Sequence, residues 1–389
     1  MDQLTVAVLG GSGFLGQHVV SELLTEAQKM GEGEGQETKA TRPLCIKEIW
    51  VLDVKPYTPC VVSPSDTRVK VVFKECDVRE LSQLKEALAG AAAVINCAAV
   101  LPNFTREDLG CNSYMRQVNV DGVKNVVEAC CEAGVGVLVH TSTIVVVKTA
   151  GNRLLEHTET LTPRGPEKDL LLGDYALMRL RAEHIVLGAH LTPLSTGAKL
   201  QTVVLRPPIT YGEGDTSFVP LVLGMARAGG NRLPSVGNPE AFLQAAYVGN
   251  VAVAHVNALG HLISGRSDGM EGCGGMPVYV TDDTPPHNLS GLAEPFLHHL
   301  SLQPSKNHSY WIISLMMLIA SIWAMFWSLL GFKKERNLSS LPPLTLHRLA
   351  ATITVVSRMR AELYLGYTPR YTWDQAQHRS NSYYTKYLV

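Results

Sequence analysis

Short apolar stretches alternate with longer amphipathic ones over the first half of the chain. Apolar runs predict six strands, at residues 4–9, 46–53, 69–73, 92–97, 136–142 and 201–206. Helices are expected between them, over residues 14–28, 80–90, 115–133 and 174–188. Strands that alternate with helices pair in parallel, and strands covered on both faces are apolar nearly throughout. The pattern therefore predicts an α/β fold with a doubly wound parallel sheet over residues 1–206.

The rest of the chain is less regular. Residues 207–300 and 345–389 are expected to form a smaller C-terminal lobe on the substrate side of the sheet. Within the first half, residues 31–43 are polar and rich in glycine, so they predict a surface loop for which the sequence suggests no function.

One stretch departs from the pattern of a soluble protein. Residues 311–332 contain no charged side chain, and as a helix they would extend about 33 Å, close to the roughly 30 Å of a bilayer core. Tryptophans stand toward both ends, and Lys333, Lys334 and Arg336 follow. The alternative is a buried core helix. We favour a membrane-associated helix over residues 309–334, with membrane lipid as the partner of residues 311–332.

Composition narrows the class of protein. Of the 389 residues, 46% are hydrophobic and 18% are charged, which excludes disorder over the whole chain. The net charge of −1 provides no overall field that would recruit nucleic acid. The eight cysteines form no CxxC pair, so we expect buried free thiols and no metal site.

Glycines at the first predicted strand-to-helix turn indicate a nucleotide site. Gly10, Gly13 and Gly16 form GxxGxxG, the spacing of Rossmann-type folds, in which a helix N-terminus faces a pyrophosphate. Asp53 ends the second strand, where an acid binds ribose hydroxyls and repels a 2′-phosphate, which favours NAD over NADP. The alternative is a turn residue. The remaining candidates for cofactor contact are Phe14, Leu15, Asp77, Ala98 and Ala99.

Asp77 follows the third strand and has two interpretations. Its carboxylate either binds the adenine amine or caps the helix over residues 78–90. Ala98 and Ala99 follow the fourth strand, and their small side chains would let the backbone pass close to a cofactor.

A proton acceptor is needed beside a nicotinamide, and the DYALMRLRAE stretch offers one. Tyr175 opens the predicted helix, and Arg179 lies one turn later on the same face. A cation there lowers the tyrosine pKa and can bind ribose hydroxyls. Hydroxyl side chains, among them Ser142 and Thr143, follow the fifth strand, and Asn119 lies in the preceding helix. Without further support, Tyr175 would be interpreted as an ordinary helix tyrosine at an interface.

The chain resembles the extended short-chain dehydrogenase/reductase superfamily and, within it, the 3β-hydroxysteroid dehydrogenase/Δ5-4 isomerase family. The resemblance covers most of the chain and rests on GGSGFLGQHVV, VINCAAV, VNVDGVKNVVEAC, VLVHTSTIVVV, LRPPITYGEGD, YVGNVAVAHVNAL and LGYTPRYTW. It implies a nucleotide-binding domain with a smaller C-terminal substrate lobe. It also implies oxidation of a sterol 3β-hydroxyl with NAD, and binding to the endoplasmic reticulum membrane.

The resemblance also assigns roles by position. Tyr175 matches the catalytic tyrosine, Asn119 a supporting asparagine, and Thr143 the hydroxyl residue, with Ser142 as the near alternative. Pro207 falls in the segment after the sixth strand that lies near the nicotinamide. Arg179 stands where the family has lysine, and arginine keeps the positive charge but cannot pass on a proton.

These features together predict a membrane-associated, NAD-dependent oxidoreductase that converts a 3β-hydroxysteroid or sterol to the 3-ketone in steroid or lipid metabolism. Isomerisation from Δ5 to Δ4 stays open. The alternatives are a decarboxylating sterol-4-carboxylate 3-dehydrogenase, or a catalytically degenerate NAD-binding membrane protein because of Arg179. The expected location is the endoplasmic reticulum membrane, with a mitochondrial membrane as the alternative. Assembly into a homo-oligomer stays open.

The resemblance also bears on membrane topology. The YLGYTPRYTW stretch at residues 364–373 resembles the family's last element of the substrate lobe. If it packs on the catalytic lobe, both flanks of the apolar segment lie on one side of the membrane. We therefore expect a monotopic anchor or a re-entrant hairpin in preference to a single crossing. The basic residues after the segment argue for the crossing.

Overall fold

A computed structural model describes most of the chain. The described residues are 3–31, 44–61, 68–101, 113–149, 153–162, 167–228, 230–233, 241–264, 272–297, 302–304 and 352–387, with single positions between 315 and 327. Most of the glycine-rich loop expected over 31–43 and most of the helix expected over 309–334 lie outside the described residues.

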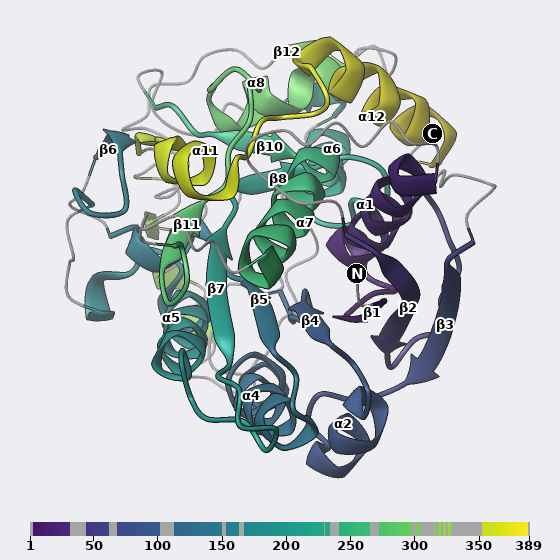
Figure 1. Cartoon of the computed structure of the whole chain (residues 1–389). Coiled ribbons are helices and arrows are strands. Elements are labelled where there is room, and N and C mark those ends of the chain that lie inside the picture. Colours follow the sequence, from purple (N-terminus) through teal and green to yellow (C-terminus); the bar gives the residue numbers. More distant parts are fainter. Residues whose placement is uncertain are drawn as a thin grey trace.

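A parallel sheet of seven strands forms the centre of the molecule (Figure 1). Its order is β11-β7-β5-β4-β1-β2-β3, so the chain winds outward from β1 in both directions. The strands are β1 (Leu4–Leu9), β2 (Ile46–Asp53), β3 (Lys70–Glu75), β4 (Ala93–Asn96), β5 (Val137–Thr141), β7 (Gln201–Arg206) and β11 (Pro277–Tyr279). The doubly wound parallel sheet and all six expected strands are confirmed, and β11 is an addition.

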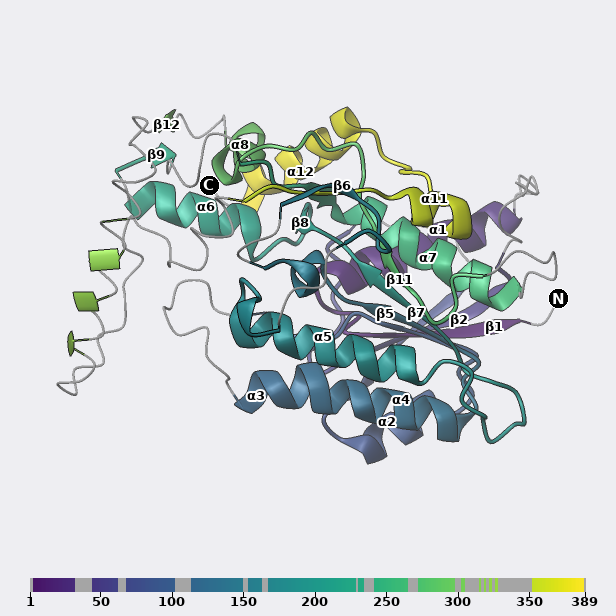
Figure 2. The same cartoon turned by 90° about the vertical axis from the view of Figure 1, so that its left-hand side faces the viewer.

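Helices cover both faces of this sheet, as Figure 2 shows. One face carries α2 (Leu81–Leu88), α4 (Gly122–Ala133) and α5 (Gly173–Gly188). The opposite face carries α1 (Phe14–Gly31), α7 (Val248–Ser264) and α11 (Met359–Leu365). The four expected helices are confirmed, although the helix expected over 115–133 is divided. Its parts are α3 (Ser113–Arg116), a π-helical turn (Gln117–Asp121) and α4.

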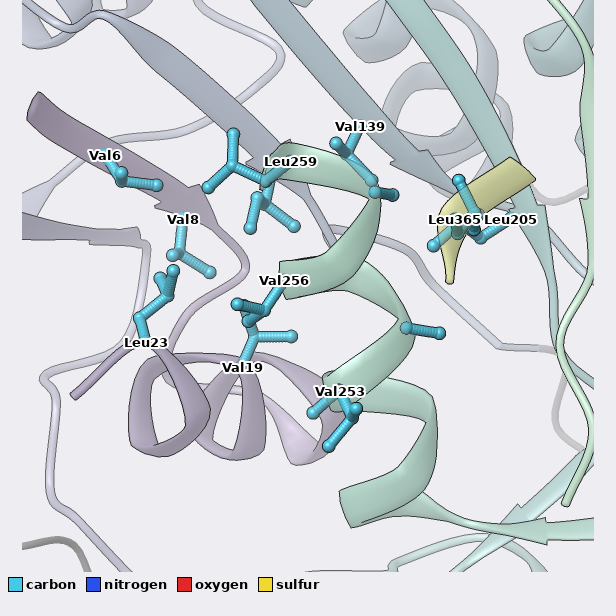
Figure 3. Close-up of a cluster of buried hydrophobic side chains, with 14 of the residues drawn as sticks. Val6, Val8, Val19, Leu23, Val139, Leu205, Val253, Val256, Leu259 and Leu365 are labelled. Atoms are coloured by element: carbon cyan, nitrogen blue, oxygen red, sulfur yellow. The ribbon is translucent and has the colours of Figure 1, made fainter. Parts of the chain in front are cut away.

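Successive side chains of each strand point to opposite faces of the sheet, and so they contribute to two separate cores. In β1, Val6 and Val8 point into the cluster under α1 and α7, whereas Ala7 and Leu9 point toward α2 and α4. Figure 3 shows side chains of β1, α1 and α7 in close proximity, with Val8, Val19 and Val256 among those labelled. Because both faces are buried, the strands read as continuous apolar runs.

Two elements that complete this body come late in the chain. β11 pairs with β7 at the edge of the sheet, and α7 packs beside α1 on its face. β11 has only three residues, too few for a periodic pattern, and nearly every residue of α7 is buried, which removes the amphipathic signal. The division of the chain into domains at residue 206 stays a prediction.

The remaining elements gather beyond the carboxyl ends of the strands. Three short parallel pairs join β8 (Ile209–Tyr211) to β10 (Ala245–Tyr247), β6 (Leu154–His157) to β13 (Thr354–Val356) and β9 (Arg232–Leu233) to β12 (Gln303–Pro304). The α-helices here are α6 (Phe218–Ala228), α8 (Leu289–Ala293) and α12 (Trp373–Tyr387). Single 3-10 turns cover Ile144–Val147, Glu167–Asp169 and Glu294–Phe296. A third core around Tyr211, Tyr247 and Phe296 joins several of them, and β6 and β13 pack with Tyr279 of β11 in a smaller cluster.

The apolar segment is described only at single positions. Leu315, Ile319, Ile322, Trp323 and Phe326 are among them, and all the described side chains there are exposed. Among the helices that the structure describes, none combines the length and the apolar character needed to cross a bilayer.

Candidate active site

The turn between β1 and α1 has no room for a side chain at several glycines, among them Gly10 and Gly16. Gly10 has a φ of +70°, and a Cβ atom there would lie 2.7 Å from the backbone nitrogen of Ala98. A Cβ on Gly16 would lie 2.1 Å from the carbonyl oxygen of Gly10, so α1 begins pressed against the turn. Gly13, in contrast, is exposed. Phe14 and Leu15 open α1 and are half-buried in the adjoining cores.

Asp53 lies at the end of β2 beside the glycine turn. Its carboxylate accepts hydrogen bonds from the backbone N–H of Ser12 at 3.0 Å and of Lys55 at 3.1 Å. The Ser12 hydroxyl donates to the carbonyl of Lys55, which closes this small loop. The half-buried carboxylate is therefore held at the carboxyl edge of the sheet, next to the N-terminus of α1. Its bond from the N–H of Lys55, two residues on, is that of the alternative turn residue, and contact with a ribose stays a prediction.

Asp77 belongs to a neighbouring loop but does not cap a helix with its side chain. The N-cap of α2 is Glu80, and the carboxylate of Asp77 binds the guanidinium of Arg79 at 2.5 Å. The hydrogen bond from Arg79 lowers the pKa of Asp77. Contact of Asp77 with adenine stays a prediction.

Asn119 organises the loop that follows β4. It is fully buried in the π-helical turn, and its amide exchanges two hydrogen bonds of 2.8 Å with the backbone N–H and carbonyl of Val100. A π turn inside a helix often marks a functional position. Asn119 thus fixes the backbone just beyond Ala98 and Ala99, the two small residues expected near a cofactor.

Tyr175 and Arg179 lie on one face of α5 and are buried, with 6% and 3% of their surface exposed. The guanidinium of Arg179 donates to the carbonyl oxygen of Thr141 at the end of β5. Burial raises the pKa of Tyr175, and the positive charge of Arg179 acts in the opposite direction. The structure thus brings the predicted base and its cation to the strand that leads to Ser142 and Thr143.

The two hydroxyl candidates have different surroundings. Thr143 is half-buried and caps the 3-10 turn over 144–147, since its hydroxyl accepts from the backbone N–H of Val145 at 3.4 Å. Ser142 is buried, and within the described part of the chain its hydroxyl has no hydrogen-bond partner. Pro207 is also buried here, and its carbonyl accepts from the N–H of Ile144. Ser142 is therefore the freer of the two.

Buried polar atoms without partners indicate that this site takes a polar ligand. Among the described residues, Nε and Nη1 of Arg179 and the hydroxyl of Ser142 lack a hydrogen-bond partner. Leaving such groups unpaired costs about 1–3 kcal/mol each, so they are usually satisfied by a ligand or by water. The donors of Arg179 suit ribose hydroxyl oxygens, and the N-terminus of a helix such as α1 suits a phosphate. These residues fit a dinucleotide.

Sequence reasoning missed a supporting pair beneath this site. Asn96, at the end of β4, accepts from the N–H of Ala98 at 3.1 Å and lies 3.3 Å from Nδ1 of His140. Burial lowers the pKa of His140 well below its usual range, and the charge of Arg179 adds to the effect. His140 is therefore neutral and adds no second positive charge beside Arg179. The only sign of this pair in the sequence is a histidine inside an apolar strand.

Comparison with known protein families and sequences gives consistent matches. The model of the 3-beta hydroxysteroid dehydrogenase/isomerase family matches residues 7–310. Human 3 beta-hydroxysteroid dehydrogenase type 7 is 29% identical over 385 residues, 97% of this chain and 95% of that protein. The monkeypox virus 3 beta-hydroxysteroid dehydrogenase/Delta 5-->4-isomerase is 29% identical over 255 residues. That match spans 65% of this chain and 65% of the viral relative, just under two thirds of its length.

Solved structures share the fold at low sequence identity. MoeE5, in complex with UDP-glucose and NAD, has a TM-score of 0.63 at 18% identity, covering 99% of this chain and 100% of that one. The UDP-glucose 4-epimerase of Thermus thermophilus, in complex with NAD, has a TM-score of 0.61 at 20% identity with the same coverage. At these identities the likeness establishes the fold alone.

Proposed function

The chain belongs to the 3-beta hydroxysteroid dehydrogenase/isomerase family, and from this we propose that it oxidises the 3β-hydroxyl of a steroid or sterol to the 3-ketone with NAD. The observation that carries the proposal is the placement of Tyr175 and Arg179 on one buried face of α5. They lie against the carboxyl end of β5, and the glycine turn follows the carboxyl end of β1 in the same parallel sheet.

The cofactor would be held by residues from several strands. The first turn of α1 would bind the pyrophosphate, and Asp53 would accept from the adenosine ribose hydroxyls. Arg179 would donate to the nicotinamide ribose through the nitrogens that no described residue occupies. When bound, NAD supplies the acceptor for the hydride.

The protein's own groups would manage the proton. Tyr175, as phenolate, would take the proton of the substrate hydroxyl, and the charge of Arg179 would stabilise that phenolate. Ser142 would donate to the substrate oxygen and orient it, because its hydroxyl has no partner among the described residues. Thr143 would hold the 3-10 turn that follows. Asn119 would support the site by fixing the loop at Val100.

The experiment that tests this function uses the full-length protein in detergent. It is incubated with NAD and a panel of 3β-hydroxysterols while NADH absorbance is followed, with Tyr175→Phe as the control. We expect turnover that falls by about 10² to 10⁴ in Tyr175→Phe, as for the loss of a general base. Product analysis then separates simple oxidation from Δ5-to-Δ4 isomerisation and from release of carbon dioxide by a 4-carboxysterol.

Arg179 supports a second candidate function, a catalytically degenerate protein that binds NAD. Arginine cannot pass a proton onward as the family's lysine can. NAD binding without turnover on any sterol would favour this candidate and would contradict the dehydrogenase.

We also propose that the protein is anchored to a membrane through residues 311–332. Seven described positions between 315 and 327 all carry exposed apolar side chains, which are costly in water. The endoplasmic reticulum is the proposed location, with a mitochondrial membrane as the alternative. A membrane-docked protein would receive sterols from the bilayer in which they dissolve.

A further inference from the structure

The last helix of the chain, α12, binds the loop formed by residues 212–215 after β8 (α12 is yellow in Figure 1). The hydroxyl of Tyr384 accepts from the N–H of Gly212 at 3.0 Å and donates to the carboxylate of Asp215 at 3.1 Å. One turn earlier on α12, Nε of Arg379 donates to the carboxylate of Glu213 at 3.0 Å. Two side chains of α12 therefore hold three of the four loop residues.

The same loop contacts the beginning of α1. Nε2 of His18 lies 2.8 Å from the carbonyl oxygen of Glu213. A Cβ atom on Gly214 would lie 3.5 Å from the ring of Phe14, so the loop backbone packs directly on that ring. Phe14 and His18 belong to the first two turns of α1, whose N-terminus is the candidate pyrophosphate site. The 212–215 loop is thus held between α12 and the cofactor end of α1.

The buried surroundings of Tyr384 show what its hydroxyl contributes. Its side chain is fully buried, and its ring packs edge-on against Phe296 at 5.5 Å, a contact that phenylalanine would make equally well. Asp215 is also buried and caps α6 by accepting from the backbone N–H of Phe218 and Val219. The Tyr384 hydroxyl therefore joins the loop, the start of α6 and α12 at one point.

We propose that α12 is part of the cofactor site, with Tyr384 and Arg379 as positioning residues that hold the 212–215 loop against α1 and so set the affinity for NAD. The inference rests on the proposed function, because it takes NAD as the ligand. It assigns a role to a helix that follows the apolar segment and lies more than 350 residues after the glycine turn.

The test measures the Kd of NAD by titration calorimetry on the full-length protein in detergent. We expect Tyr384→Phe to raise the Kd on the order of tenfold, since it removes two buried hydrogen bonds from the loop. The turnover number at saturating NAD should stay within about twofold, as for a change confined to cofactor binding. Tyr387→Phe is the matched control, because it removes the same atom from an exposed residue of the same helix.

A second variant tests the same loop contact independently, so that the test still holds if Tyr384→Phe fails to fold. Arg379 is partly exposed, so Arg379→Gln should fold, and it should raise the Kd of NAD in the same direction. An unchanged Kd in both variants would overturn the inference, and so would a lower melting temperature with an unchanged Kd in the folded protein. Failure of the wild-type chain to bind NAD would instead overturn the proposed function, and the inference with it.

Discussion

At the scale of single residues, Arg179 supplies the buried positive charge of the candidate site. Its guanidinium donates to the carbonyl of Thr141. Its charge remains buried beside Tyr175, with neutral His140 nearby. A positive charge that acts to lower the pKa of Tyr175 is therefore present beside it.

The pH dependence of turnover tests this role of Arg179. Oxidation needs the deprotonated Tyr175, so the rate should rise with pH until the pKa of Tyr175 is passed. Arg179→Met removes the cation that lowers this pKa, so the rising limb should move to higher pH and kcat/KM at neutral pH should fall about tenfold or more. Arg179→Lys keeps the charge and should leave the limb near its wild-type position. Superimposable pH profiles for Arg179→Met and the wild type would contradict the assigned role.

At the scale of elements, the sequence predicted the strand–turn–helix unit of β1 and α1. Three glycines at fixed spacing predicted a strand-to-helix turn, which the structure shows between β1 and α1 with close contacts at Gly10 and Gly16, and the pyrophosphate site there stays a prediction. The π turn at Asn119 was not predicted, because its five residues are too few to show a period of their own within a helical segment.

The glycine contacts lead to a matched pair of variants. In Gly16→Ala the new methyl group would overlap the carbonyl of Gly10, so α1 must move away from the turn. We expect a loss of stability of about 1–3 kcal/mol and a marked loss of NAD affinity. Gly188→Ala, in the last turn of α5, meets nothing within 4 Å and should stabilise the protein by about 0.5–1 kcal/mol. Melting temperatures and NAD titration check both, and wild-type NAD affinity in Gly16→Ala would count against the proposed pyrophosphate site.

At the scale of the whole molecule, the segment after residue 351 returns to the body that the chain builds first. Arg370 and the hydroxyl of Tyr371 both bind the carboxylate of Glu22 on α1, and Asn250 of α7 pairs with the backbone of Tyr371. The expected membrane topology depended on residues 364–373 packing on the body of the protein, and the structure shows this packing. Both flanks of the apolar segment therefore belong to one folded body.

This packing leads to a prediction about topology. Epitope tags placed ahead of residue 302 and after Val389 should lie on the same face of the membrane. Antibody labelling after selective permeabilisation of the plasma membrane should therefore detect both tags or neither. Detection of one tag alone would establish a single crossing and would contradict a monotopic anchor or hairpin.

The sequence by itself determined the parallel α/β sheet, its first six strands, the glycine turn and the pairing of Tyr175 with Arg179. These features depend on periodicity and short spacing, which local chemistry sets. Only the tertiary structure decided that β11 and α7 complete the central body, that Asn96 and His140 support the site, and that α12 holds the 212–215 loop. These are contacts between residues far apart in the chain. Such contacts form where apolar faces are buried and where buried polar groups find partners, and no local pattern records which partner they find.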